Sequence, residues 1–420
     1  MNGVTASTVE AETSEFREGW SVVLVCFCVA TFAWGFGFYG QSVFLAELHA
    51  TRGWPTSLIA SATTVNYLTG AALLTCVHRA IDKFGPRLLL AGGTAIMAVS
   101  AIGLSRVQAP WQLYLCSTVM AIGWAGTTTT AIALTLAYWF DRRRGLALSL
   151  ALTGASAGGF TIAPLLVRLV HRMGLEQAVL LLALGGLVIL LPMVVAGVGG
   201  SASAGAKPPS RHVAHAAMDP RTSFTSRTEA LRSLHFWTIA LPFALALAAQ
   251  VGFIVHQVTF LLPRLGNDGT GIAIAATAIA AAGGRLAFAP MIDGMNQRAA
   301  SAASFASQAA GLALMLVLPD RPEALYIGSV IFGLSVGNVI TLPALIVQRE
   351  FAPRSFGVVI GLTSMVGQAT LAFGPTLLGL ARDATGSYDA AIGLCIALQL
   401  VAAILVLLRP RRGRGNRANA

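Results

Sequence analysis

Arg285 is the residue whose type and position in this chain most strongly suggest chemistry. It lies within the apolar stretch 271–292, eight residues before Asp293. At about 1.5 Å per residue, this spacing places the guanidinium ~12 Å inside a bilayer core that is about 30 Å thick. A cation at that depth costs from about 3 to well over ~10 kcal/mol, and an anion is its natural partner. We therefore expect Arg285 to bind a negatively charged ligand.

Other polar side chains at membrane depth are candidates for the same site. Tyr39 and Gln41 could donate hydrogen bonds to a carboxylate. His256 has two open interpretations: packing against neighbours, or protonation that follows the substrate, since its unperturbed pKa is about 6.5. Intramembrane polar groups face a cavity or join helices, so both uses stay open for the remaining side chains. These are Asn66, Tyr67, Gln250, Gln257, Asn338 and Gln368.

A second group of charges falls where helices are expected to end at the cytoplasmic surface. It comprises Asp82, Lys83, Arg87 and Asp293. As a gate, these charges would join two halves of the protein in one conformation and separate in the other. As topology anchors, the basic members would only orient the chain, but acidic residues contribute little to orientation. For Asp82 we therefore favour the gate.

The composition defines the environment of these residues. Mean hydropathy is +0.73 and only 11% of residues are charged, against roughly a quarter in soluble domains. The chain is thus an integral membrane protein, and because two-residue alternation is absent, it is all-α rather than a barrel. Twelve apolar runs have the length of a transmembrane helix: 20–45, 57–77, 88–106, 111–139, 145–170, 175–199, 235–262, 270–292, 300–319, 322–347, 357–381 and 388–408.

The distribution of basic residues predicts the orientation. With the N-terminus inside, twenty of the 28 Lys and Arg residues fall in cytoplasmic segments, seven in outer loops, and Arg285 is the remaining one. This is the positive-inside pattern, so we expect both termini to lie in the cytoplasm. The membrane is expected to be the plasma membrane, which is the inner membrane of a bacterium. The net charge of +11 therefore does not indicate nucleic-acid binding, and the basic tail is expected to meet anionic membrane lipid.

The spans divide into two repeated halves. We expect a disordered cytoplasmic tail at 1–19, a six-helix bundle at 20–199, a flexible linker at 200–232, a second bundle at 233–408 and a basic tail at 409–420. Three pairs of landmarks recur at an offset of 211 or 212: Asp82 and Asp293, Gly145 and Gly357, Pro164 and Pro375. Such parallel repeats occur in alternating-access carriers, which bind substrate between the halves.

Several enzyme-like motifs lack the required context. Gly35, Gly37 and Gly40 form a G-x-G-x-x-G inside a membrane helix, where it favours packing or bending rather than a dinucleotide site. The G-x-S-x-G sequences at 154–158 and 333–337 have no strand-turn-helix context, so we interpret them as helix contacts. The five cysteines fall in spans without metal-ligand spacing. We expect no enzymatic activity, no cofactor and no metal.

Five stretches carry a resemblance to a known family. Residues 78–87, HRAIDKFGPR, resemble the loop 2–3 signature of the major facilitator superfamily, with His78 and Pro86 as departures. Residues 52–57, 138–147, 255–261 and 284–293 resemble the monocarboxylate transporter group and its bacterial oxalate/formate-exchanger relatives. The resemblance covers residues 20–408. It implies the major facilitator fold, and it implies that Arg285 occupies the place of the arginine that binds the substrate carboxylate.

Two departures bear on proton coupling. Proton-coupled members of that group have an Asp four residues before this Arg, where the chain has Ala281, and a Lys in helix 1 where it has Gln41. We expect a secondary carrier of a small mono- or dicarboxylate that works as a monomer, with an unidentified coupling ion and little dependence on a pH gradient. The alternatives are an efflux carrier for lipophilic or cationic compounds, and a membrane receptor on the same fold.

Overall fold

The computed structural model describes residues 3–140, 143–198, 227–288, 295–351 and 355–408. These residues are helical apart from short turns. The N-terminal half consists of α1 (Gly3–Trp34), the π-helix η1 (Gly35–Tyr39), α2 (Gln41–Arg52), α3 (Thr56–Ser105), α4 (Pro110–Ala125), α5 (Thr129–Leu136), α6 (Arg144–Phe160), α7 (Ile162–Met173) and α8 (Leu175–Gly197). The C-terminal half consists of α10 (Arg227–Arg232), α11 (Leu234–Phe288), α12 (Gln297–Val317), α13 (Pro322–Glu350), α14 (Phe356–Thr385) and α15 (Asp389–Leu407).

Twelve membrane crossings follow from ten long helices in this part of the chain. Ten helical segments are long and apolar enough to cross a membrane. Two of them, α3 and α11, are twice the usual length, with 50 and 55 residues. Each is divided by a glycine with positive φ, Gly85 in α3 and Gly266 in α11, where the chain turns back. The all-α fold and the number of spans expected from the sequence are therefore confirmed.

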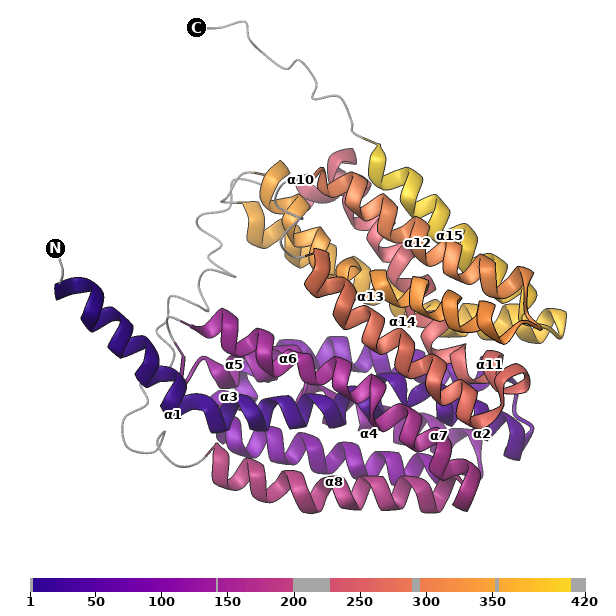
Figure 1. The fold of residues 1–420 in the computed structure, drawn as a ribbon, viewed down its shortest axis with the longest axis horizontal. Helices are drawn as coiled ribbons and strands as arrows, with labels where there is room; N and C mark the ends of the chain where they lie inside the picture. The colour runs from indigo at the N-terminus through magenta and orange to yellow at the C-terminus, as the bar shows by residue number, and fades with distance from the viewer. Residues whose placement is uncertain (1–2, 141–142, 199–226, 289–294, 352–354, 409–420) are drawn as a thin grey trace, which may run out of the picture.

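The crossings pack as two helical bundles (Figure 1). α1 to α8 form one bundle and α11 to α15 the other, with α8 on the outer side of the first bundle, and α12 and α15 on the outer side of the second. The bundles meet where α7, α2 and the bend of α11 lie side by side, and they diverge toward the opposite end. We call the first the closed end; by the distribution of basic residues, it is the end expected to face outward.

Two expectations about the segments outside the bundles need correction. α1 begins at Gly3, so most of the 1–19 tail expected to be disordered is helical. This segment contains four Glu residues and no Pro, and it continues directly into the first crossing. The linker expected at 200–232 contains α10 at its end. Residues 199–226, Asp293 and the basic tail lie outside the described residues.

Glycines bring the helices of each half close together. A Cβ at Gly154 or Gly158 of α6 would meet the carbonyl oxygen of Phe27 or Thr31 in α1. In the other half, a Cβ at Gly333 of α13 would lie 2.5 Å from the carbonyl oxygen of Thr277 in α11. The two G-x-S-x-G sequences are therefore helix contacts, as predicted, because only glycine permits backbones to approach this closely.

Candidate functional site

Arg285 belongs to α11, and its side chain lies against α13 at mid-height of the C-terminal bundle. Its neighbour Gly337 follows Pro322, the start of the 29-residue helix α13, by fifteen residues, so it is near the middle of that helix. A Cβ at Gly337 would lie 2.9 Å from Nε and 3.2 Å from Cβ of Arg285. The Arg285 side chain therefore extends across a glycine, and a larger residue at 337 would crowd both this side chain and the carbonyl oxygen of Ala281, which would be 2.8 Å from the Cβ.

The guanidinium of Arg285 is not neutralised within the described part of the chain. Its Nε is buried and has no hydrogen-bond partner, and no described acidic side chain pairs with it. A buried donor without a partner costs free energy, and a charged one costs more. The Nε of Arg285 is therefore a buried donor that is available to a ligand.

Arg298 provides an internal comparison because its side chain, unlike that of the half-buried Arg285, is fully buried. Its Nε and Nη2 bond both oxygens of Glu350 at 2.8 and 2.7 Å, and its Nη1 donates to the carbonyl oxygens of Val406 and Leu408 at 2.8 and 3.0 Å. Its Nη2 also donates to Thr238 Oγ1 at 3.1 Å. Arg298 therefore ties the ends of four helices together. This chain satisfies a structural arginine fully, which makes the unsatisfied Arg285 a functional candidate.

Tyr39 is the predicted residue that the structure brings to Arg285. Tyr39 is the last residue of η1, the π-helical segment that contains Gly35 and Gly37. The next residue is Gly40, where a Cβ would lie within 2.8 Å of the carbonyl oxygens of residues 35 and 36. Single π-helical turns are frequent at functional sites. The Tyr39 ring packs on Gly159 of α6, and a Cβ at Gly159 would lie 2.7 Å both from this ring and from the Cβ of Ala278 in α11. Its hydroxyl and the Arg285 guanidinium are close enough to interact electrostatically. A tyrosine from one half and an arginine from the other thus share one region.

Gln41 and His256 are bound to other groups. The amide of Gln41 donates to Met120 Sδ at 3.0 Å and accepts from Thr63 at 3.4 Å. His256 is buried, with Nε2 2.9 Å from the carbonyl oxygen of Pro375 and Nδ1 3.0 Å from the hydroxyl of Tyr388. Since the carbonyl only accepts, Nε2 carries the proton and Nδ1 accepts from the tyrosine. This geometry favours the packing interpretation of His256 over the substrate-linked one.

The remaining polar candidates have different environments. Asn66 and Tyr67 are placed with Oδ1 and the hydroxyl buried and unpaired, so both could serve a ligand. Asn338, adjacent to Gly337, is buried and bonds only weakly within its own helix, at 3.5 Å. Gln368 is exposed on α14. Gln250 and Gln257 bond to Gln308 and Thr277 respectively, and therefore join helices of one half.

Asp383 is a residue that the sequence reasoning missed, and it joins the two halves at the closed end. Its carboxylate accepts from the backbone amide of Ser57 at 2.8 Å, from that of Thr56 at 3.3 Å and from Thr56 Oγ1 at 2.8 Å. These groups begin α3 in the opposite half, whose N-cap position is Pro55 and which has no cap of its own. A helix start without a local cap was the signal in the sequence, because its free amides need an acceptor.

Other contacts between the halves lie at the same end. Gly379 of α14 packs on α3 so closely that a Cβ would lie 2.7 Å from Ser57 Cα. Arg382 reaches His49 at 3.1 Å, and Arg168 pairs with Asp268 at 3.1 Å in an exposed ion pair. Together with the Asp383 cap, these contacts hold the two bundles together at the closed end, to one side of Arg285 and Tyr39.

The three described gate charges, Asp82, Lys83 and Arg87, lie at the bend of α3 around Gly85, where the first limb of this helix ends. Asp82 forms a half-exposed pair with His78 at 3.6 Å, and Lys83 lies over the Phe84 ring. Asp82 follows Thr64 by eighteen residues, which is five turns of an α-helix, so both lie on the face of α3 directed at the other half. The fourth charge, Asp293, lies outside the described residues. In this conformation the Asp82 side chain is exposed.

Two bundles of membrane-length helices, with an arginine of unpaired Nε inside one of them, have the architecture of a membrane transporter. The sequence profile of the Major Facilitator Superfamily matches residues 27–375, and the chain belongs to that family. The superfamily suggested by the motif at 78–87 is thereby confirmed.

Individual relatives agree with this placement. Bovine Monocarboxylate transporter 13 is 27% identical over 412 residues, covering 95% of this chain and 91% of its own length. Human Monocarboxylate transporter 11 is 29% identical, covering 78% and 70%. The uncharacterized MFS-type transporter YcxA of Bacillus subtilis is 23% identical, covering 93% and 95%. The nucleoside transporter NupG has the same fold, with a TM-score of 0.73 over 93% of this chain at 12% identity.

Proposed function

We propose that the protein is a secondary transporter of a small organic anion, a mono- or dicarboxylate, and that Arg285 binds its carboxylate. The observation that carries the proposal is the half-buried Arg285 side chain at mid-height of the fold, whose buried Nε has no hydrogen-bond partner and which interacts electrostatically with Tyr39 of the opposite half. A guanidinium offers a planar fork of donors that matches a carboxylate with two parallel hydrogen bonds. The relatives named as monocarboxylate transporters support this substrate class.

Transport follows from the position of the site between the two bundles. The closed end is held by Asp383 and Gly379 against the start of α3, while Asp82, at the far end of the first limb of α3, is exposed. In the reverse conformation, the Asp383 contacts break and Asp82 meets the C-terminal bundle. An anion between Arg285 and Tyr39 contacts both halves at once, so its binding energy favours the rocking of one half against the other.

The test is uptake of labelled carboxylates into proteoliposomes. Arg285→Gln should abolish uptake and Arg285→Lys should retain at most a part, since a point charge replaces a bidentate fork. Arg264→Gln is the matched control because it removes one arginine from the same helix, where Arg264 lies over the Phe260 ring at 4.4 Å. Wild-type uptake rates in the Arg285→Gln variant would refute the proposal.

A further inference from the structure

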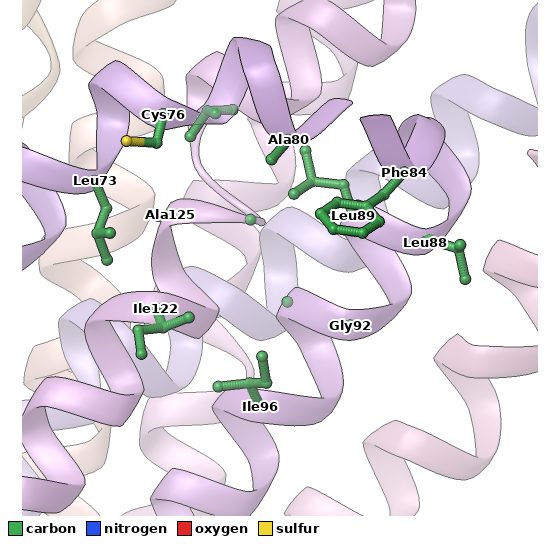
Figure 2. A pocket seen from close by; sticks show the side chains of 13 residues that line it. Leu73, Cys76, Ala80, Phe84, Leu88, Leu89, Gly92, Ile96, Ile122 and Ala125 are labelled. Atoms are coloured by element: carbon green, nitrogen blue, oxygen red, sulfur yellow. The ribbon is translucent and has the colours of Figure 1, made fainter. Parts of the chain in front are cut away.

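A groove on the N-terminal bundle, separate from the Arg285 site, carries a second inference. It has a volume of ≈ 320 Å³ and lies between the two limbs of α3 and the end of α4. Figure 2 shows Leu73, Cys76 and Phe84 from the first limb, with Ile96 of the second limb and Ile122 of α4 facing the same space. Val77 and Ala125 form its buried floor, whereas Phe84, Leu88 and Ile122 are exposed at its rim.

The groove faces away from the other half of the protein. On α3, Thr64 contacts Ala372 and Thr376 of α14 and so marks the side directed at the C-terminal bundle. Leu73 follows Thr64 by nine residues, which is two and a half turns, so it lies on the opposite side of the helix. The groove is therefore outside the transport path and opens toward lipid.

Its length matches one leaflet of a bilayer. Leu73 and Phe84 are eleven residues apart, or about 16 Å along the helix, which is roughly half of a hydrocarbon core about 30 Å thick. Its lining is apolar, with Cys76 as the most polar side chain. An acyl chain lying along α3 from the membrane surface to the middle of the bilayer would fill it.

The surface end of the groove carries positive charge. Lys83 Nζ lies 5.2 Å from the centroid of the Phe84 ring, which lines the groove. Arg87 is exposed and directly precedes Leu88 at the rim. A lipid whose chain occupies the groove would thus present its headgroup to an ammonium and a guanidinium.

We propose that this groove binds an anionic phospholipid, with one acyl chain between Leu73 and Leu88 and the phosphate beside Lys83 and Arg87. The proposal does not depend on the substrate of the carrier. It gives the basic residues of loop 2–3 a ligand, while Asp82, on the side directed at the other half, remains available to the gate.

The experiment is native mass spectrometry of the full-length protein with phosphatidylglycerol and phosphatidylcholine as competing lipids. Gly92 lines the groove, and a Cβ there would have no atom within 4 Å, so Gly92→Leu fills the groove without displacing the backbone. Gly185→Leu is the matched control, since Gly185 of α8 also has open space around it. Lys83→Gln removes one headgroup contact, and Arg232→Gln removes an exposed charge expected at the same membrane surface.

The expected result is one retained phosphatidylglycerol fewer in Gly92→Leu than in wild type or Gly185→Leu. Lys83→Gln should weaken phosphatidylglycerol binding about fivefold, as for other juxtamembrane basic residues, and Arg232→Gln should leave it unchanged. Equal lipid retention in Gly92→Leu and Gly185→Leu would overturn the proposal. So would an equal loss of phosphatidylcholine, which would show a groove without headgroup selection. If Gly92→Leu does not fold, the Lys83 and Arg232 pair decides alone.

Discussion

Removing the Asp383 carboxylate should open the closed end. The carboxylate accepts three hydrogen bonds from Thr56 and Ser57 of the other half, and its side chain is 20% exposed. A hydrogen bond to a charged group contributes roughly 1.5–3 kcal/mol net. Because these bonds are partly solvated and cooperative, we take about 3 kcal/mol for Asp383→Ala. Asp383→Asn retains one acceptor oxygen, so we take about 1.5 kcal/mol for it.

These energies predict the change in the open population. At 1.4 kcal/mol per factor of ten, the open fraction should rise ~150-fold in Asp383→Ala and ~10-fold in Asp383→Asn. The reporter is a cysteine at Ala60, which is fully buried on α3 one turn after Thr56. With Cys76 replaced by Ser, the rate of alkylation by a membrane-impermeant maleimide is proportional to the time that this end is open.

The control separates the helix cap from charge pairing in general. Asp268→Asn also breaks an ion pair between the halves, but Arg168 and Asp268 are 55% and 81% exposed. Exposed pairs contribute about 0–1 kcal/mol, so the alkylation rate should change less than about fivefold. An alkylation rate in Asp383→Ala equal to that of the parent would refute the assignment of Asp383 as the lock of the closed end.

Three further predictions test other parts of the structure. Gly337→Ala should raise the KM for uptake, since the added Cβ crowds Arg285 Nε and the Ala281 carbonyl oxygen and so displaces the Arg285 side chain. Gly361→Ala, where a Cβ meets nothing within 4 Å, should behave as wild type in the same uptake assay. His256→Gln should lower the apparent melting temperature, because two buried hydrogen bonds are lost, while the pH profile of uptake keeps its shape; a displaced profile would restore His256 to the transport step. Arg298→Met should destabilise the protein by about 3–5 kcal/mol by leaving Glu350 without its main partner, and an unchanged denaturation midpoint would contradict this.

Sequence reasoning recovered the fold because membrane helices are specified locally. Apolar run lengths and the distribution of basic residues are properties of single segments, and they gave twelve crossings in two halves. The division of α3 and α11 follows from Gly85 and Gly266, which the chain needs where it turns back with positive φ. The initial segment of α1 was misjudged because a polar segment without Pro can continue a transmembrane helix beyond the membrane surface.

The site was only partly accessible from the sequence because side-chain direction depends on tertiary packing. The cost of burying a charge singled out Arg285 without knowledge of its neighbours. Tyr39 and Gln41, two residues apart, looked alike in sequence, yet a π-helical turn places one near Arg285 and the other against Met120. Asp383 was missed because its partner, the start of α3, lies 327 residues away in the chain.

The central claim, that Arg285 binds a carboxylate, is tested most directly by binding rather than transport. Thermal-shift screening against small acids identifies a ligand. The dissociation constants of that acid and of its neutral amide are then measured for wild type and for Arg285→Gln. The reference is the dissociation constant of the acid for wild type. Replacing the acid by its amide, or Arg285 by Gln, removes the charge-assisted pair and should raise this constant by about 10- to 150-fold. Making both changes together should add little further loss. Additive losses, or an acid that binds Arg285→Gln as tightly as wild type, would contradict the account.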